Sequence, residues 1–501
     1  MTLSRAFSVT LVGLDPLLVV VEADLSPRET PPLIIIGLPD AAVREAKDRL
    51  LPALKNSGFR LGGHSFTVNL APGGLKKQGA LYDLPMALAM LKALKVLEGE
   101  SLEEYLIAGE LSLSGEIRPI RGALLMASFA RSLGKRGLIL PKANAAEASL
   151  VPGLEVIGVE RLDEVVAYLQ GKRSIASAPR SKPLLSTSPP SIDFREVRGQ
   201  LMAKRALEIA AAGSHNLLLC GPPGSGKTML ARAFVGILPP ITFEEALETT
   251  KIYSIAGHLS EGEQLISQRP FRSPHHTVSY AGLIGGGSQP KPGEVSLAHN
   301  GVLFLDEFAE FSRTTLEVLR QPLEDGVVTI SRASGHLTFP ARFICLAAMN
   351  PCPCGYLGHA MQRCIDTELQ INRYRGRISG PLLDRMDMRI VVPAVRYHDL
   401  WSESVEESSE VVLQRVQEAR MRSYARNGGV IPNGSLSPRR LREVAPLARG
   451  CQEVLAQAME GARSARSHDR LLRLARTIAD LDGLPALEPA HLLEALSFQE
   501  I

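Results

Sequence analysis

The middle of this chain contains a glycine-rich segment, Gly221-Pro222-Pro223-Gly224-Ser225-Gly226-Lys227-Thr228. It lies between an apolar run at 216–220, predicted to be a buried strand, and a predicted helix at 229–235 that begins with Met229. In that setting, backbone N–H groups can turn toward phosphate oxygens, and the helix N-terminus adds partial positive charge. We expect Lys227 to reach the β- and γ-phosphates of ATP and the Thr228 hydroxyl to bind Mg²⁺. A chance glycine-rich turn is disfavoured, because every fixed position of the pattern is present.

A second apolar run ends in two acidic residues. Residues 302–305 are predicted to form a strand, and Asp306 and Glu307 follow it directly, as in a Walker B motif. Asp306 is expected to hold Mg²⁺, and Glu307 to polarise the attacking water. A third predicted strand, 343–349, delivers Asn350 to the same sheet edge, where its amide would orient water.

Composition sets limits on the class of protein. The chain has 501 residues, enough for two or three domains, with 45% hydrophobic and 22% charged residues, as in an ordinary globular protein. A net charge of +3 neither demands nor excludes nucleic acid as a partner. The apolar start at 9–21 is broken by Gly13, Asp15 and Pro16, so neither a signal peptide nor a membrane span is expected, and we predict a cytoplasmic protein.

The predicted fold class is α/β, in four parts. Residues 1–170 alternate strand-like and helix-like stretches, and 171–193, rich in Ser, Pro and Lys, are expected to be a linker. Residues 194–395 contain the phosphate loop and the acidic strand, and so form an ATPase core with a parallel sheet. Residues 406–501 are helical throughout and are interpreted as a lid.

Phosphoryl transfer also needs positive charge beyond the γ-phosphate. Arg385 follows a Gly-Pro break and lies between two acidic residues, and Arg466 starts a predicted helix of the lid. Either residue taken alone is more simply explained as a surface salt bridge. Together with the phosphate loop and the acidic strand, both become candidates for the catalytic site.

The run from Arg269 to Glu307 resembles the magnesium-chelatase-like AAA+ ATPases. It contains PFRSPHHT at 270–277, LIGGG at 283–287 and PGEVSLAHNG at 292–301, and the segments 378–387 and 474–481 agree. The close resemblance is to the YifB/ComM family. It implies that Asn350 is the first sensor, that Arg385 is an arginine finger reaching a neighbouring subunit, and that Arg466 is the second sensor. It also implies a homo-oligomeric ring, expected to be a hexamer.

Residues 1–170 resemble the proteolytic domain of Lon proteases, in which a Ser–Lys dyad does the catalysis. Leu81 stands at the position that matches the nucleophile, and Leu124 at the position that matches the base. An apolar side chain cannot attack a carbonyl or accept a proton. We therefore expect a scaffold or partner surface rather than a protease.

Three of the six cysteines are clustered. Cys352 and Cys354 precede Cys364, and Asp366 takes the fourth position of a possible tetrahedral Zn²⁺ site, with His359 lying between the pairs. Family members typically carry Cys-x-Cys twice, and Asp366 departs from that pattern. The alternative is a loop of reduced thiols without metal.

The alternation over residues 327–339 predicts a β-hairpin that turns at Ser334-Gly335. In a ring, Arg332 and His336 would contact the phosphates of a polymer without reading its sequence, with Lys251 and His258 adding to them. A hairpin that packs only on its neighbour is an equal alternative. A set of arginines at helical spacing is expected to form a solvated or nucleotide-facing side: Arg463, Arg466, Arg470, Arg473 and Arg476.

These features predict an ATP-driven motor on single-stranded or branched DNA. The resemblance implies a helicase-like, branch-migration role in natural transformation and recombination. The alternative is a magnesium-chelatase motor acting on a protein or tetrapyrrole partner. A protease or unfoldase is disfavoured by the two leucines at the dyad positions.

Overall fold

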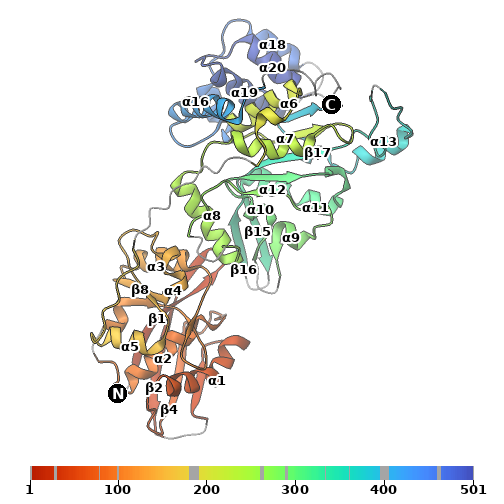
Figure 1. Ribbon diagram of the computed structural model, residues 1–501. Coiled ribbons are helices and arrows are strands. Elements are labelled where there is room, and N and C mark those ends of the chain that lie inside the picture. The colour runs from red at the N-terminus through yellow and green to blue at the C-terminus, as the bar shows by residue number, and fades with distance from the viewer. Residues whose placement is uncertain are drawn as a thin grey trace. The chain divides into compact units, whose positions relative to one another are not determined.

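The structure is a computed structural model that describes residues 3–27, 31–77, 79–98, 101–179, 191–259, 264–287, 291–332, 335–359, 361–394, 406–459 and 464–499. The chain divides into two compact units (Figure 1). The first comprises Met1–Leu184 and Ala246–Ser267, and the second comprises Leu185–Glu245 and Gln268–Ile501. The predicted α/β class is confirmed, and the predicted linker lies partly outside the described residues.

The first unit is built on a seven-stranded mixed sheet in the order β3-β4-β2-β1-β5-β8-β9. Strand β1 pairs antiparallel with β2 and β2 with β4, whereas the other neighbours run parallel. The strands of the sheet are β1 (Ser4–Val12), β2 (Asp15–Ser26), β3 (Leu33–Ile36), β4 (Ser65–Ala71), β5 (Tyr105–Ile107), β8 (Gly137–Pro141) and β9 (Glu155–Val159). A separate hairpin joins β6 (Glu110–Leu111) to β7 (Ile117–Arg118).

The helices of this unit cover the sheet, and α2 packs on β1 and β2. They are α1 (Ala41–Asn56), α2 (Asp83–Ala93), α3 (Ala123–Ser132), α4 (Lys142–Ala148) and α5 (Leu162–Leu169), with 3-10 turns η1 (Ala80–Tyr82) and η2 (Ser101–Glu104). Asp40 caps α1 by accepting a hydrogen bond from Val43 N at 2.9 Å, as its place before an apolar periodic run predicts.

Helix α8 (Phe243–Ala256) begins in the second unit and continues into the first. Its Ser254 hydroxyl donates to the buried Glu147 carboxylate at 2.6 Å and accepts from Gly122 N at 2.9 Å. Leu124 N donates to the same carboxylate oxygen at 3.0 Å, and burial raises the pKa of Glu147. These bonds make residues 246–256 an integral part of the first unit, although they follow the phosphate loop in sequence.

The second unit contains a five-stranded parallel sheet in the order β11-β14-β17-β10-β18. Its strands are β11 (Phe271–Arg272), β14 (Val302–Leu305), β17 (Ile344–Met349), β10 (Leu217–Cys220) and β18 (Met388–Val391). Every residue of β10, β14 and β17 is buried, as expected for parallel strands covered on both faces. Their carboxyl ends therefore meet at one edge of the sheet.

Helices α6 and α7 pack beside this sheet. Along the chain, the other helices of the core fall between its strands. The core helices are α6 (Leu201–Gly213), α7 (Lys227–Phe234), α9 (Tyr280–Ile284), α10 (Glu294–Leu297), α11 (Arg313–Glu317), α12 (Arg320–Asp325), α13 (Glu368–Arg375) and α14 (Gly380–Leu383). Two hairpins project from it, β12–β13 (Gly285–Gly286, Lys291–Pro292) and β15–β16 (Val327–Arg332, Gly335–Pro340). The 3-10 turns are η3 (Phe194–Glu196), η4 (Val235–Ile237), η5 (Phe308–Glu310) and η6 (Asn433–Ser435).

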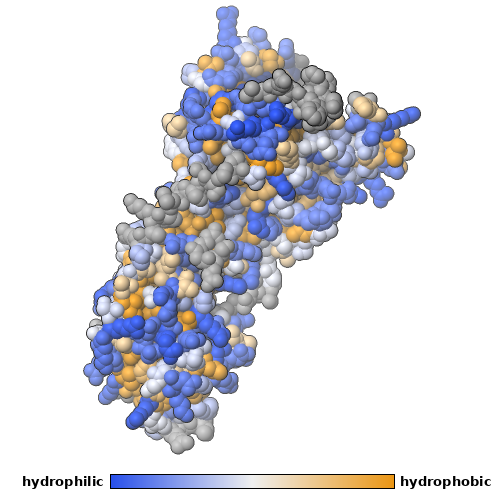
Figure 2. All heavy atoms as spheres, viewed as in Figure 1, coloured by the Kyte–Doolittle hydropathy of each residue, from blue (hydrophilic) through white to orange (hydrophobic). Residues whose placement is uncertain are grey.

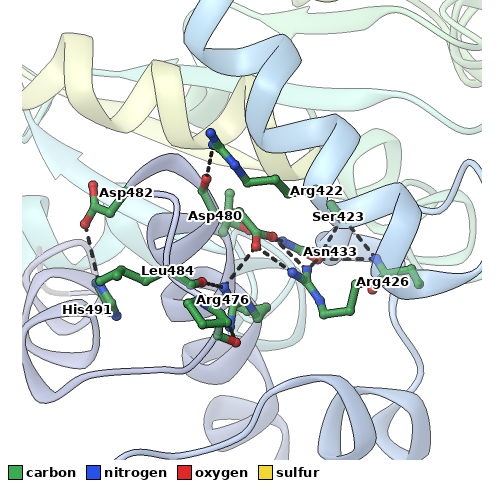
Figure 3. Close-up of polar contacts among 12 residues, drawn as sticks. Arg422, Ser423, Arg426, Asn433, Arg476, Asp480, Asp482, Leu484 and His491 are labelled. Atoms are coloured by element: carbon green, nitrogen blue, oxygen red, sulfur yellow. Dashed lines mark hydrogen bonds and ion pairs between the residues drawn. The ribbon is translucent and has the colours of Figure 1, made fainter.

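The C-terminal helices are held by a buried polar network (Figure 3). They are α16 (Ser409–Asn427), α17 (Pro438–Val444), α18 (Cys451–Met459), α19 (Ala465–Leu481) and α20 (Pro489–Ser497). Asp480 on α19 is 1% exposed and accepts from Arg426 at 2.5 and 2.7 Å, from Arg476 at 2.9 Å and from Asn433 at 2.8 Å. Leaving such a buried cation without its anion costs about 3–5 kcal/mol, so the network fixes α16 against α19.

The expectation of a solvated or nucleotide-facing arginine stripe is wrong for two of its residues, Arg470 and Arg476. Arg476 is fully buried and donates to the carbonyls of Leu484 and Pro485 at 2.5 and 2.8 Å. Arg470, 8% exposed, donates to the carbonyls of Asp384 and Met386. Arg470 and Arg476 are thus internal packing rather than part of a solvated side, whereas Arg466 is exposed, Arg473 is half-buried and Arg463 lies outside the described residues.

Among the described residues, no helix is long and apolar enough to cross a membrane. Figure 2 shows hydrophilic and hydrophobic residues interspersed over the visible face of the chain. The broken apolar start forms β1 and β2, whose inward residues belong to the core of the first unit.

Candidate active site

The phosphate loop connects β10 to α7, as predicted. Gly224 and Gly226 have φ values of +75° and +88°, a region that glycine adopts without strain, and no atom lies within 4 Å of a Cβ built on either. Gly221 is required for a different reason, since a Cβ there would lie 2.2 Å from the carbonyl oxygen of Val392. The loop therefore leaves the N-terminus of α7 open to a ligand, with Lys227 as its first helical residue.

Lys227 is a buried cation with neutral partners. Its side chain is 9% exposed, and its Nζ donates to the carbonyls of Gly221 and Pro222 at 2.7 and 2.8 Å and to Asn350 Oδ1 at 3.3 Å. Desolvation lowers its pKa, and the Asp306 carboxylate opposes that shift. An ammonium group held by neutral oxygens beside an open helix N-terminus fits the phosphates of ATP.

The acidic strand lies as predicted beside the loop. The Thr228 hydroxyl donates to Asp306 Oδ2 at 2.8 Å. A hydroxyl and a carboxylate oxygen are the ligands that Mg²⁺ takes in a nucleotide site, so this pair fits the expected metal. Asn350 completes the edge, one residue beyond β17, through its contact with Lys227.

Glu307 points to a partner that sequence reasoning missed. His276 Nδ1 lies 2.8 Å from Glu307 Oε2, and the side chains are 29% and 58% exposed. His276 follows β11, which pairs in parallel with β14, the strand that precedes Glu307. In the sequence, the pair HH within PFRSPHHT marks only the family resemblance, and nothing in its spacing assigns His276 a role.

The two candidate arginines meet on one carboxylate. Arg385 forms an ion pair with Glu324, and Arg466 Nη2 lies 2.8 Å from Glu324 Oε1. Glu324 lies on α12 of the same chain, and its pKa is lowered mainly by the hydrogen bond from Arg385. The finger and second-sensor candidates thus form one pair around a shared anion, a grouping that their sequence positions did not suggest.

The structure brings Asp366 rather than His359 to the cysteine cluster. The sulfurs of Cys352, Cys354 and Cys364 lie 3.4 to 3.6 Å from one another, and Asp366 Oδ2 lies 3.7 Å from Cys364 Sγ. His359 instead accepts from backbone N–H groups within its own loop. The cluster adjoins the phosphate loop, because a Cβ on Gly355 would lie 2.6 Å from Pro223 Cδ.

The predicted hairpin at 327–339 is confirmed by the antiparallel pairing of β15 with β16, from Val327↔Pro340 to Arg332↔Gly335. Its predicted turn at Ser334 and the side chain of Arg332 lie outside the described part of the chain. His336 is exposed and contacts Ser331 Oγ at 2.9 Å. Lys251 and His258 belong to the other unit.

In the first unit, Leu124 is fully buried on α3 and Leu81 is partly buried in η1. Two polar side chains of this unit, Ser112 and Lys77, have partners of their own. Ser112 Oγ contacts Ser114 Oγ at 2.8 Å, and Lys77 Nζ donates to the carbonyl of Pro72.

Three families of known proteins match separate stretches of the chain. Residues 193–400 match the family described as magnesium chelatase, subunit ChlI; residues 21–144 match subunit ChlI of Mg-chelatase; and residues 406–499 match the ChlI C-terminal family. These matches cover the phosphate loop, the acidic strand and both candidate arginines.

Similarity to individual proteins extends over the whole chain. YifB of Escherichia coli (strain K12) is 42% identical over 508 residues, which cover 100% of this chain and 98% of that protein. Rv2897c of Mycobacterium tuberculosis (strain H37Rv) is 42% identical over 504 residues, with 100% and 99% covered. The competence protein ComM of Haemophilus influenzae is 40% identical over 504 residues, with 100% and 98% covered. The chain therefore belongs to the YifB/ComM family of magnesium-chelatase-like AAA+ proteins.

Proposed function

We propose that this protein is a Mg²⁺-dependent ATPase that works as a homo-oligomeric, hexameric ring on DNA in the cytoplasm. The observation that carries the proposal is the convergence of Lys227, Asn350, Thr228 and Asp306 at one sheet edge. Bound ATP would supply the γ-phosphoryl group for transfer to water. The loop N–H groups and Lys227 would hold its phosphates, Thr228 and Asp306 its Mg²⁺, and Glu307 would position water.

DNA is proposed as the substrate of the motor, with a helicase or branch-migration activity. The relative named competence protein ComM supports a role in transformation. The hairpin supports a contact with DNA that is coupled to ATP hydrolysis, because only residues 341–343 separate β16 from β17, the strand that ends beside Asn350.

The second candidate, a chelatase-type motor acting on a protein or tetrapyrrole, is favoured by the names of the matching families. No peptidase activity is proposed, because leucine occupies both dyad positions.

Replacing Arg332 with Ala is expected to reduce strand displacement on forked DNA while leaving basal ATP turnover near the wild-type value. A phosphate contact is electrostatic, so its loss should also make DNA binding less sensitive to salt. In a plot of the logarithm of the binding constant against the logarithm of the salt concentration, the slope should become shallower by about one for each subunit that contacts DNA through Arg332. Displacement of a labelled strand and DNA binding over a salt series would measure both. Lys291→Ala in the other hairpin is the matched control, expected to behave like wild type. If Arg332→Ala unwinds as well as wild type, this hairpin is not the grip.

We also propose that Cys352, Cys354, Cys364 and Asp366 hold a structural Zn²⁺ ion. With Zn–S bonds of about 2.3 Å, a tetrahedral site spaces its sulfurs about 3.8 Å apart. The observed separations of 3.4 to 3.6 Å are close to that spacing, and all four ligand atoms lie within 4.8 Å of one another. Zinc there would stiffen the loop that follows Asn350 and packs on Pro223.

Elemental analysis of protein purified without chelators is expected to find about one zinc per chain. Cys354→Ser should lose most of it, because a closed structural site needs all four ligands. Cys451→Ser is the control, since that buried thiol donates to the carbonyl of Leu487 in the lid instead. Wild-type protein with no bound metal would contradict the site.

A further inference from the structure

A small pocket opens on the first unit between α3, α8 and the turn that follows α4, three helices that are labelled in Figure 1. It has a volume of about 330 Å³, and every residue that lines it belongs to that unit. Its wall is largely apolar and includes Leu124, Leu150, Val151 and Leu247. Leu124, at the position that matches the base of the dyad, thus contributes apolar surface to a pocket.

One buried carboxylate holds the three sides of the pocket together. Glu147, on α4, is 7% exposed, and it accepts from Leu124 N on α3 at 3.0 Å and from the Ser254 hydroxyl on α8 at 2.6 Å. Gly122 N, directly before α3, donates to the same hydroxyl at 2.9 Å. The walls are therefore positioned before any ligand arrives, which lowers the entropic cost of binding.

Two cationic side chains line the pocket, one from each of its helices. Arg131 of α3 is exposed, and Lys251 of α8 is half-buried. Neither forms an ion pair with another residue in the described part of the chain, whereas Arg136, close to Arg131 in sequence, pairs with Glu155 at 3.0 Å. The chain therefore leaves two positive charges at the pocket for a ligand to neutralise.

The other groups of the lining narrow the class of ligand. The hydroxyls of Ser128 and Ser132 donate to carbonyls of their own helix at 2.9 and 2.8 Å. No aromatic side chain is among the described residues that line the pocket, so a nucleobase would have no ring on which to stack. Ligand pockets range from about 300 to 1,000 Å³, so this one holds one or two apolar side chains rather than a large cofactor.

We propose that this pocket is a docking site for an acidic, apolar peptide segment of a protein partner. One or two apolar side chains of that segment enter the pocket, and carboxylates on either side of them pair with Arg131 and Lys251. Two cations on separate walls fit two carboxylates, whereas a fatty acid offers only one. This role is separate from the ATP site, and it gives Lys251 a partner other than the phosphate expected from the sequence.

Selection of a random peptide library, displayed on phage, against the full-length protein tests whether the pocket is a docking site. We expect the selected peptides to combine Leu, Ile, Phe or Met with Asp or Glu, and labelled synthetic copies to bind in fluorescence anisotropy. Ser132→Trp places a large ring at an exposed position of the lining, so it should remove most of that binding. If no selected peptide distinguishes wild type from Ser132→Trp protein that thermal unfolding shows to be folded, the docking site is overturned.

Charge variants test the chemistry of the partner. Arg131→Ala and Lys251→Ala should each weaken binding of the selected peptides roughly two- to fivefold, the range of a partly exposed ion pair, and added salt should weaken binding to wild type. Arg44→Ala is the matched control, because Arg44 is an exposed arginine on α1 that does not line the pocket.

Two results would overturn an acidic peptide as the ligand. The first is that the selected peptides are basic, or that neither alanine variant changes their affinity. The second is that a labelled fatty acid or single-stranded oligonucleotide binds wild type but not Ser132→Trp and displaces the selected peptides, because the pocket then serves that ligand instead.

Discussion

Replacing Glu307 with Gln is expected to leave ATP bound while slowing hydrolysis by roughly 10²- to 10⁴-fold, the usual contribution of a positioned base. The amide cannot accept a proton from water, and it orients water less well than the carboxylate. Lys227, Thr228 and Asp306 keep their contacts, so the affinity for ATP should remain close to that of wild type.

Single-turnover hydrolysis and nucleotide binding, measured on the same preparation, would separate the two effects. Glu310→Gln is the matched control, since that nearby acid forms an ion pair with Arg377 at 2.7 Å and has no assigned part in hydrolysis. Glu307→Gln turning over ATP at the wild-type rate would remove Glu307 from the reaction.

Replacing Arg385 with Ala is expected to lower ATP turnover roughly 10³-fold or more, the scale of an arginine finger. We further expect it to act in a neighbouring subunit, because its partner within the chain is Glu324 rather than the phosphate loop. A ring that mixes Arg385→Ala with Lys227→Ala would contain some interfaces with an intact phosphate loop and an intact finger. Such rings should recover part of the activity that each variant lacks alone.

Turnover measured across a titration of the two variants would detect that recovery as a curve with a maximum at intermediate ratios. Mixed rings must be confirmed by pulling down one tagged variant and detecting the other. Arg377→Ala serves as the control, being an arginine of the same region that is paired with Glu310. If confirmed mixed rings show no recovery of ATP turnover at any ratio of the two variants, a role of Arg385 in a neighbouring subunit is contradicted.

Local patterns were enough to predict where several residues of the candidate site lie. A buried apolar strand followed by Gly221 to Thr228 fixes a phosphate loop, and a second such strand fixes Asp306. Because parallel strands end at one sheet edge, the closeness of Thr228, Asp306 and Asn350 followed from their order along the chain. The α/β class and the hairpin at 327–339 could also be predicted from local patterns in the sequence.

The missed features all depend on non-local pairing. β11 is two residues long, so no periodicity revealed that it would place His276 beside Glu307. The arginines of α19 have helical spacing, but the carbonyl acceptors of Arg470 and Arg476 lie outside the helix, which spacing alone cannot show. Likewise, the sequence of α8 gives no sign that Ser254 bonds to Glu147 in the first unit.

The most direct test of an ATP-driven motor on DNA is steady-state ATP turnover with and without DNA over a range of salt concentrations. Single-stranded and branched DNA should each be compared with protein alone. We expect at least one of them to raise turnover, and the stimulation to fall steeply as salt increases, because binding is through phosphates. If ATP turnover depends on Glu307 but neither kind of DNA stimulates it at any salt concentration, the proposal of a DNA motor is contradicted and the chelatase-type alternative is favoured.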